Sequence, residues 1–406
     1  MGGERREEFL SMQQDTKNLK VMHLCLDFLL RTETFVYEFV TKTPNTISSV
    51  LTYKRHNKED FPWDKVFSRN DQAPLYRVWD RIYRMGTSKY ARPFSFFFKK
   101  IVAQEKPDLL HAHFGNTALY GLYLRQRFKI PLMTSFYGRD ISELPRKKYY
   151  QKMYPKLFEQ GDGFLVEGSY MKRCLAALGC PEEKIYIRHI GIDLEKFIFQ
   201  EKKIESGAKV IILMCCRFLE KKGLEDAVFA FAKALITFPN MELRIIGDAY
   251  KQNLDLKKRV EDFIKKQGLT EKIILLGWLN QVQYRKEAGA AHIFLQPSKT
   301  AKSGDSEGGA PTVILEMEAA GLPIVSTYHA DIPEVVRDKE NAYLSPEGDI
   351  EDIARNIVNM VKAQDRWPQM GRIGRAHVEA QYNIIKEAEK VYDICRKILD
   401  AYSLSK

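Results

Sequence analysis

The sequence predicts an α/β protein of two domains, each built on a doubly wound parallel sheet, with a central cleft between them. The 406 residues are long for a single hydrophobic core and suit two cores of ordinary size. In both halves, short apolar runs rich in β-branched residues alternate with longer helical patterns, which is typical of parallel βαβ units. Because open parallel sheets bind ligands at the carboxyl ends of their strands, we expect a substrate between the halves.

Each half supplies its own set of strand candidates. In the first half the expected strands are residues 21–26, 47–52, 109–113, 132–136, 164–166 and 185–187. In the second half they are residues 210–215, 242–246, 273–276, 293–295 and 323–326, with helical patterns between them such as 224–237 and 254–267.

The domain boundaries follow from these runs and from polar stretches. We expect a polar tail at 1–18, a first domain at 19–199, a polar linker at 200–207 and a second domain at 208–380. The remaining residues, 381–406, predict a helix that packs back on the first domain.

The sequence carries no transport or membrane signal. Residues 1–20 are polar and charged, and no apolar run approaches the roughly 20 residues that a membrane-spanning helix needs. The six cysteines form no CxxC pair and no metal-ligand spacing. We therefore expect a cytoplasmic protein with reduced cysteines.

Positive charge is concentrated in the first half of the chain. The formal net charge is +11, and residues 1–200 hold 33 basic and 23 acidic residues, a net of +10. Such a half suits a phosphate-bearing ligand, an anionic membrane surface or nucleic acid. A well-solvated surface without a partner is an equally open interpretation.

The strongest chemical signal is a glycine-rich loop at residues 299–311, followed by a predicted helix at 312–320. Pro311 suits the first helical position, because its missing N–H would be unpaired there. Gly308 and Gly309 allow the backbone to approach a ligand, and the helix start attracts anions. The loop predicts a diphosphate site; a purely structural strand-loop-helix connection is the alternative.

Four charged side chains are expected around this diphosphate site. Arg217 and Lys222 follow the strand at 210–215, where a forked guanidinium and an ammonium suit the phosphates of a leaving nucleotide. Glu316 lies one turn into the helix, within reach of ribose hydroxyls, and Glu307 precedes the glycines, where it would hold hydroxyls of a donor sugar. The chain has no Asp-x-Asp motif for a divalent cation, so we expect no metal and no cofactor. Surface charge before a helix is the alternative for the basic pair.

Four local patterns together resemble family 4 of the retaining glycosyltransferases, whose GT-B fold has two Rossmann-like domains. They are Arg217-x4-Lys222-Gly223; Gly277-Trp278 after an apolar strand; Glu307-Gly308 leading to Leu315-Glu316 and Gly321-Leu322-Pro323; and His189-Ile190-Gly191-Ile192-Asp193 with Phe197. The resemblance covers nearly the whole chain from about Leu19 onward. The two glutamates have eight residues between them, one more than is usual in the family.

This resemblance implies a reaction and a set of site residues. The reaction is transfer of a sugar from a UDP- or GDP-sugar to an acceptor, with retention of anomeric configuration and without a metal. Arg217 and Lys222 match the phosphate-binding pair, Glu316 the ribose ligand and Glu307 the sugar-facing carboxylate. The other expected nucleotide contacts are Gly247, Gly277, Trp278, Leu279, Gly308, Gly309 and Ala310.

The first half carries a second, shorter pattern. Thr32-Glu33-Thr34-Phe35 resembles the motif of a bacterial exopolysaccharide branch that includes colanic-acid-type enzymes, and it is also a plain helix start. Tyr137 replaces the usual histidine of the family's Thr-x-His-Gly-x-Asp motif, which ends here at Asp140. We expect Thr32, Glu33, Tyr137 and Asp140 to contact sugar or acceptor.

His113 ends a predicted strand, which would place its imidazole at the cleft. A neutral imidazole suits a catalytic base or a sugar ligand near pH 7. A histidine that only satisfies a strand end is the alternative.

Three other function classes are alternatives to sugar transfer. A nucleotide-sugar 2-epimerase of the same architecture stays open, and it would isomerise the donor without an acceptor. A basic nucleic-acid-binding protein also stays open, although the chain lacks aromatic-interleaved basic platforms, zinc motifs and helix-turn-helix patterns. A nicotinamide dehydrogenase is excluded because no GxGxxG follows either first strand.

The exopolysaccharide resemblance implies a lipid-linked acceptor at the inner face of a membrane. Basic residues occur with aromatics at 81–100, including Phe94, Phe96, Phe97 and Phe98, and at 146–156, including Tyr149, Tyr150 and Tyr154. A basic residue near an anionic leaflet contributes about 1 kcal/mol, so a handful allows reversible docking. We expect a peripheral protein that prefers anionic vesicles, while residues 96–98 are equally open to being a buried helix face.

Overall fold

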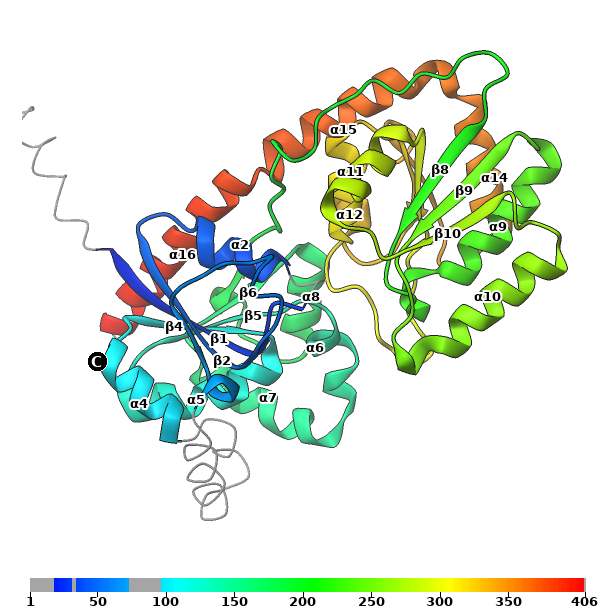
Figure 1. Ribbon diagram of the computed structural model, residues 1–406. Helices are drawn as coiled ribbons and strands as arrows, with labels where there is room; N and C mark the ends of the chain where they lie inside the picture. The colour runs from blue at the N-terminus through cyan, green and yellow to red at the C-terminus, as the bar shows by residue number, and fades with distance from the viewer. Residues whose placement is uncertain (1–17, 31–33, 73–95, 405–406) are drawn as a thin grey trace, which may run out of the picture.

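The computed structural model describes residues 18–30, 34–72 and 96–404, which form two α/β domains side by side (Figure 1). Every strand pair in the two sheets is parallel. The N-terminal sheet has seven strands in the order β3-β2-β1-β4-β5-β6-β7, and the C-terminal sheet has six in the order β10-β9-β8-β11-β12-β13. In each sheet the first strand lies in the interior. The next two strands are added on one side of it and the later strands on the other side, so the predicted pair of doubly wound domains is confirmed.

The N-terminal domain contains the first seven strands and the helices between them. Its strands are β1 (Leu19–Phe28), β2 (Thr46–Arg55), β3 (Val66–Ser68), β4 (Leu109–His113), β5 (Leu132–Ser135), β6 (Gly163–Val166) and β7 (Ile185–Ile187). Its α-helices are α2 (Thr34–Lys42), α4 (Phe96–Glu105), α5 (Gly115–Phe128), α6 (Arg139–Ser142), α7 (Lys148–Gln160) and α8 (Ser169–Ala177).

The C-terminal domain repeats the arrangement. Its strands are β8 (Val210–Cys215), β9 (Met241–Ile246), β10 (Ile273–Gly277), β11 (Ile293–Gln296), β12 (Ile324–Thr327) and β13 (Ala342–Ser345). Its helices are α9 (Leu224–Thr237), α10 (Leu254–Lys266), α11 (Gln281–Ala290), α12 (Thr312–Ala319), α13 (Ile332–Val335), α14 (Ile350–Lys362), α15 (Trp367–Gln381) and α16 (Ile384–Leu404).

Helices cover both faces of each sheet, which explains why the central strands are buried along their whole length. Every residue of β4, β5, β6, β11 and β12 is buried. Successive residues of β8 enter different cores: Ile212 and Met214 pack in one cluster and Leu213 in the cluster on the opposite face.

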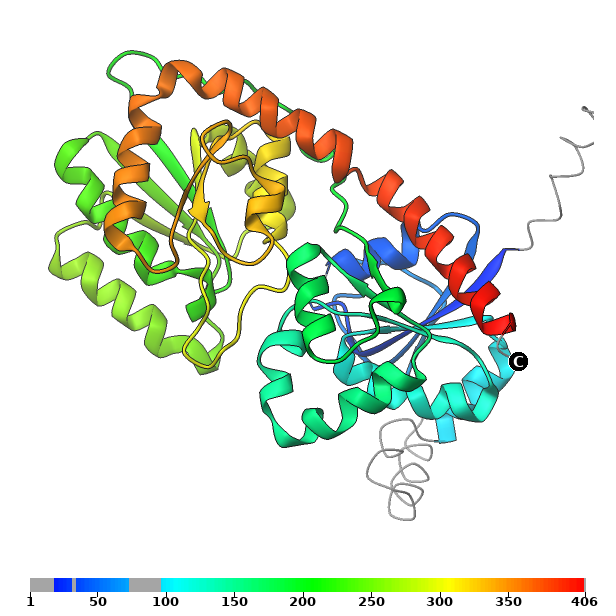
Figure 2. The same ribbon diagram turned by 180° about the vertical axis from the view of Figure 1, so that it is seen from behind.

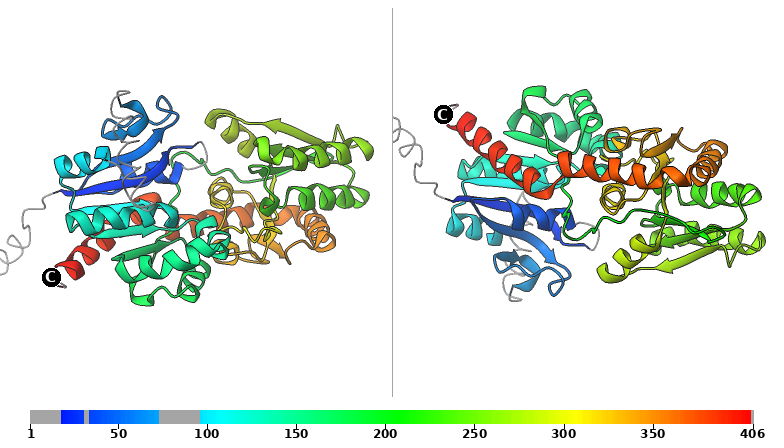
Figure 3. Two further views of the ribbon diagram at one scale, coloured as in Figure 1. Left: turned by 90° about the horizontal axis from the view of Figure 1, so that it is seen from below. Right: turned by 90° about the horizontal axis from the view of Figure 1, so that it is seen from above.

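Helix α16 crosses from the C-terminal domain to the N-terminal domain, and Figures 2 and 3 show it continuing the line of α15 along the back of the molecule. Its apolar residues Val391, Ile394 and Ile398 pack against the N-terminal sheet, where they meet Val21 and Leu165 among others. The last helix therefore completes one core of the first domain.

The element bounds agree closely with expectation in most places. Helix α9 matches the predicted range and α10 ends one residue earlier, whereas the short edge strands β3 and β13 have no counterpart in the prediction. Residues 200–207 contain no helix or strand, but Lys202 is buried and its Nζ donates to the carbonyls of Ala288 and Gly289, at 3.1 and 2.8 Å. The linker is thus attached to the C-terminal domain. Among the described helices, none combines the length and apolarity needed to cross a membrane.

Candidate functional site

A cleft of about 340 Å³ opens between the carboxyl ends of the two sheets. The C-terminal domain lines it with the residues after β8 and β9 and with the loop and first turn of α12, and the N-terminal domain with the start of α2 and the residues after β5 and β6. A second cavity of about 710 Å³ adjoins it and shares Thr34, Phe35, Trp278 and Glu316 with it. The predicted cleft is therefore present, with walls from both domains.

Three predicted charged residues meet in the cleft wall. Lys222 Nζ lies 2.6 Å from Glu307 Oε1, so these two side chains form an ion pair. Burial opposes ionisation of Glu307, but the charges of Lys222 and Lys221 outweigh it and lower the pKa of Glu307 to about 2. Arg217 lines the same cleft, and its guanidinium has no hydrogen bond or ion pair with any described residue. Lys221 lines the cleft as well and pairs with Asp305 at 3.1 Å, so the site holds two paired cations and one unpaired cation.

The loop before α12 is held by the C-terminal domain itself. Lys221 Nζ donates to the carbonyl of Ser306 at 2.9 Å. The backbone N–H of Glu307 donates to His329 Nε2 at 3.1 Å, and His329 Nδ1 donates to Glu347 at 2.6 Å. Glu307 therefore stays in the cleft wall although the loop has one residue more than is usual.

Helix α12 begins at Thr312, as predicted, but Pro311 is not its first helical residue. Pro311 has φ −56° and ψ 123°, so it lies outside the helix, and it precedes the first turn instead of belonging to it. No side chain caps this helix start, and Thr312 and Val313 line the cleft. The backbone N–H groups of Thr312 and Val313 are therefore available to an anion, whereas that of Ile314 donates to the Pro311 carbonyl at 2.9 Å.

Gly308 and Gly309 approach the other domain. A Cβ on Gly138 would lie 2.7 Å from the Gly308 nitrogen, and one on Gly309 would overlap the carboxyl of Glu167. Both glycines line the cleft, as does Ala310. Small residues are thus required here by the contact between domains, in addition to the ligand approach expected from the sequence.

The far end of the cleft carries Glu316 and aromatic side chains. Tyr284 Oη donates a short hydrogen bond to Glu316 Oε2. Burial raises the pKa of Glu316 to about 7, against the opposing effects of the Tyr284 bond and the Lys196 charge. Trp278 is 41% exposed, and its ring centroid lies 5.9 Å from that of Tyr250. This end offers an ionisable carboxyl beside an open aromatic surface.

Of the remaining predicted nucleotide contacts, two line a cavity and one does not. Leu279 lines both cavities, and Gly247 lines the cleft. Gly277 lines neither; its φ is 67°, and its carbonyl accepts from the Gly247 N–H at 2.8 Å. Gly277 therefore shapes the turn that carries Trp278 and makes no contact with the cleft.

Two predicted contacts from the N-terminal domain are wrong. Asp140 is 1% exposed, and it accepts from the backbone N–H groups of Gly115, Tyr137 and Gly138 at 2.8, 3.1 and 3.0 Å. It fixes the loop after β5 and is not available to a sugar. His113 is fully buried and lines neither cavity.

Tyr137 separates His113 from the cleft. Its Oη lies 2.7 Å from His113 Nδ1, and the residue lines the cleft. Burial, followed by the nearby His23 and Arg188, holds the pKa of His113 well below its usual value. The imidazole is therefore neutral and reaches the cleft only through the tyrosine. Thr32 and Glu33 lie outside the described residues, whereas Thr34 and Phe35 line both cavities.

Glu167 and Tyr284 are cleft residues that the sequence interpretation missed. Glu167 directly follows β6 and faces Gly309 across the cleft. Burial and the neighbouring carboxyls of Asp331, Asp140 and Glu307 raise the pKa of Glu167 well above its usual value. A carboxyl directly after a buried strand was the available signal for Glu167, and for Tyr284 it was a tyrosine one turn into the helix after Gly277-Trp278.

Two family profiles match the sequence. The profile described as Glycosyl transferases group 1 matches residues 195–377, and the one described as Glycosyltransferase Family 4 matches residues 60–196.

Similar proteins and structures agree with these matches. The amylovoran biosynthesis glycosyltransferase AmsK from Erwinia amylovora is 32% identical over 288 residues, which are 70% of this chain and 69% of AmsK. The putative colanic acid biosynthesis glycosyltransferase WcaL from Escherichia coli K12 is 26% identical over 399 residues, covering 90% of this chain and 96% of WcaL. The crystal structure of Anabaena Alr3699/HepE with UDP and glucose has a TM-score of 0.75 at 15% identity and covers 93% of this chain and 100% of that one, a likeness of fold.

Proposed function

Since the chain belongs to the group 1 and family 4 glycosyltransferases, we propose that it moves a sugar from a nucleoside diphosphate sugar to an acceptor in cell-surface polysaccharide or glycolipid synthesis. The names of AmsK and WcaL support the exopolysaccharide role, and the UDP in the HepE structure supports a nucleotide donor. A UDP- or GDP-sugar is the expected donor.

One observation carries this proposal: an unpaired Arg217, the paired Lys222 and the uncapped start of α12 face one cleft. Departure of a nucleoside diphosphate builds negative charge on its phosphates. Fixed positive groups stabilise such charge without reorganisation. We assign the diphosphate to this part of the cleft.

The same groups support a reaction without a divalent cation at the phosphates. The sequence contains no Asp-x-Asp motif, and the two basic side chains with the helix start supply positive charge in that place. Turnover should then persist in excess EDTA without added magnesium or manganese.

Retention of configuration is the expected stereochemistry. The acceptor oxygen would attack the anomeric carbon from the face that the leaving phosphate departs. The bond from carbon to phosphate oxygen breaks, and the acceptor hydroxyl proton passes to a phosphate oxygen. Glu307, an anion at neutral pH, would hold donor-sugar hydroxyls while it shares Lys222 with the phosphates.

The second cavity is the proposed acceptor site. Rings from the N-terminal domain line it, including Tyr37 and Phe61, whose centroids lie 5.3 Å apart. Glu38 and Asp193 line it as well, and both pair with Lys196, at 3.3 and 3.1 Å. Carboxylates beside aromatic rings suit the hydroxyls and apolar faces of a saccharide.

A lipid-linked acceptor would require docking at a membrane, for which α7 offers the best surface. Lys148, Lys152 and Lys156 are exposed at four-residue spacing, and none pairs with an acidic side chain among the described residues. Tyr149 is 38% exposed beside them, and Phe96 is 54% exposed on α4, which packs into the same core cluster as α7 (Figure 1).

Three of the other described aromatics in the two predicted clusters lie away from this surface. Phe97, Phe98 and Tyr154 are buried, and Phe94 lies outside the described residues. The proposed contact with an anionic membrane therefore depends on the lysines of α7.

Binding and product analysis test the proposal. Nucleoside diphosphates should raise the unfolding temperature of the wild-type chain, because a ligand of the native state stabilises it by mass action, and Arg217→Ala should reduce that shift. The stereochemistry of the glycoside formed from the best donor can be read by NMR. Isomerisation of the donor sugar in the absence of any acceptor would favour an epimerase and overturn the proposal.

A further inference from the structure

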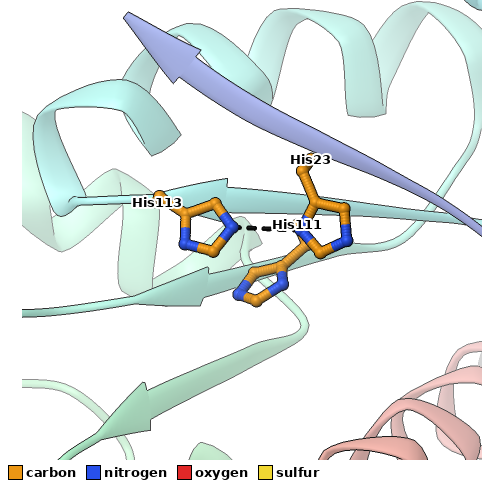
Figure 4. Close-up of side chains that lie close together, drawn as sticks. All are labelled: His23, His111 and His113. Atoms are coloured by element: carbon orange, nitrogen blue, oxygen red, sulfur yellow. Dashed lines mark hydrogen bonds between the residues drawn. The ribbon is translucent and has the colours of Figure 1, made fainter. Parts of the chain in front are cut away.

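Three histidines meet in the interior of the N-terminal domain, as Figure 4 shows. The sheet register pairs His23 of β1 with His111 of β4, and His113 follows two residues later on the same face. His23 is 2% exposed and the other two are fully buried. One ring nitrogen of each lies within 4.8 Å of those of the other two. Neighbouring strands thus bring three potential metal ligands together.

The ring nitrogens are only partly satisfied by hydrogen bonds. His23 Nδ1 lies 3.0 Å from His113 Nε2, which is one shared bond (Figure 4). His23 Nε2 and His111 Nδ1 are buried and have no hydrogen-bond partner among the described residues. Buried polar atoms without a partner are rare because they lose their bonds to water and gain none.

The outward-facing nitrogens of two rings are well held. His111 Nε2 lies 2.8 Å from Ser135 Oγ, and His113 Nδ1 lies 2.7 Å from Tyr137 Oη. Histidine ligands of metals almost always engage their second nitrogen in such a bond, which fixes the ring and its tautomer. His111 and His113 already have this outer support.

We propose that His23, His111 and His113 bind one divalent transition-metal ion, with Zn²⁺ as the best match. Zn²⁺ is bound by imidazole nitrogens at about 2.0–2.1 Å, which puts two ligand nitrogens about 3.3 Å apart in a tetrahedral site. The 3.0 Å between His23 Nδ1 and His113 Nε2 is close to that spacing, and a ring nitrogen of His111 lies within 4.8 Å of both other ligand atoms. Three ligands leave a fourth position for a water molecule.

The surrounding charges both oppose and support a cation here. Arg188 lies 3.8 Å above the ring centroid of Phe39, and that ring packs edge-on against His111 and His113. The guanidinium of Arg188 would repel a metal ion. The carboxyl groups of Glu387 and Glu38 act on the same guanidinium and offset its charge.

The ion would act on Tyr137 and not on the donor phosphates. It would join β1 to β4 directly behind the tyrosine, whose Oη bonds His113 and whose side chain lines the cleft. Because the site is fully enclosed, the ion would stay bound in chelator as long as the domain is folded. Turnover in EDTA without added cations and a firmly held zinc ion are therefore compatible.

Metal content of the full-length chain tests the proposal. The chain is refolded with excess Zn²⁺, passed through EDTA while folded, and analysed for metal. We expect about one zinc per chain, released only on unfolding. His23→Gln and His111→Gln should each lower the zinc content several-fold, whereas His56→Gln, a change at a solvent-accessible histidine that pairs with Asp27, should leave it unchanged. Loading with Co²⁺ should give the absorption spectrum of a tetrahedral nitrogen site.

Two results would overturn the proposal. One is a folded wild-type chain that retains no zinc after this treatment. The other is full zinc content in both cluster variants, which would point to the free cysteines as ligands. Should the variants fail to fold, the metal content of the wild-type chain and its cobalt spectrum still decide the matter.

Discussion

The two domains share one strand order, apart from the additional edge strand β7 of the first, but differ in what lies at the carboxyl ends of their strands. On the C-terminal side Arg217, Lys222 and Glu307 are charged and line the cleft. On the N-terminal side His113 and Asp140 are buried and hydrogen-bonded inside the domain. One edge therefore presents fixed charge to a ligand, and the other is a wall of buried side chains with Tyr137 and Glu167 at its surface. The proposal that the C-terminal domain binds the donor phosphates rests on this contrast.

The largest effect should come from the charged edge. Arg217→Ala and Lys222→Ala should each lower kcat by about 10²-fold or more, as loss of one preorganised charge commonly does. Steady-state kinetics with the identified donor measure the change. Arg259→Ala, which removes an exposed surface pair with Glu225, is the control and should have little effect. Near-normal turnover of both cleft variants would show that Arg217 and Lys222 do not stabilise the leaving phosphates.

At the N-terminal edge of the cleft, a substitution should first change the free energy of unfolding. In Asp140→Asn an amide NH₂ must face one of the N–H donors that Asp140 now accepts from, so we expect a loss of about 1–3 kcal/mol in the free energy of unfolding. Urea unfolding measures it, with Asp64→Asn, an exposed position of the same domain, as the reference. Equal stability of the two variants would show that the loop after β5 does not depend on the carboxylate.

A third test separates the two glutamates of the charged edge. Glu316→Gln should weaken binding of the free nucleoside diphosphate about 10-fold, since hydrogen bonds to a charged group are worth more than neutral ones. Glu307→Gln should lower turnover and leave that affinity almost unchanged. Titration calorimetry on both variants distinguishes these outcomes, and full activity of Glu307→Gln would show that the sugar is held elsewhere.

The pKa of about 7 at Glu316 adds a pH dependence with a definite sign. Below that pH the carboxyl is protonated and accepts weaker hydrogen bonds, and above it the carboxylate accepts stronger ones. Nucleotide affinity should therefore rise between about pH 6 and pH 8, and this slope should vanish in Glu316→Gln. A slope that survives the substitution would assign the titration to another group.

The smallest effect concerns the outer face of the N-terminal domain. Changing Lys148, Lys152 and Lys156 to Glu should abolish flotation with anionic vesicles, because each lysine contributes about 1 kcal/mol. Added salt should release the wild-type chain. The matched control changes three exposed lysines of α10, Lys258, Lys265 and Lys266, and should still float. Equal absence of binding to anionic and neutral vesicles would favour an acceptor that is not lipid-linked.

The sequence predicted the cleft residues of the C-terminal domain better than those of the N-terminal domain, for a physical reason. Arg217 follows β8 closely, Lys222 ends the short 3-10 turn between β8 and α9, and Glu316 lies one turn into α12. Local order along the chain therefore already puts them at the cleft. The burial of His113 involves helix α2, whose Phe39 packs against its ring. Neighbour contacts of that kind are not visible in the local pattern.

Contacts between distant segments were missed for the same reason. The histidine cluster requires the register of β1 with β4, which places His23 opposite His111 across a long stretch of chain. The close approach of Gly308 to Gly138 requires both domains in their final positions. A glycine signals a special backbone position, but it does not reveal which neighbour imposes it.

The path of α16 has a consequence for biosynthesis. Strand β6 leaves the ribosome early, yet Leu165 on its face is covered by Ile398, which is translated near the end of the chain. The domain that is made first is thus the last to complete its core, and its apolar sheet face must wait in a crowded cell while the second domain is synthesised and folds. For this protein, the order in which the two domains are synthesised is therefore the opposite of the order in which their cores are completed.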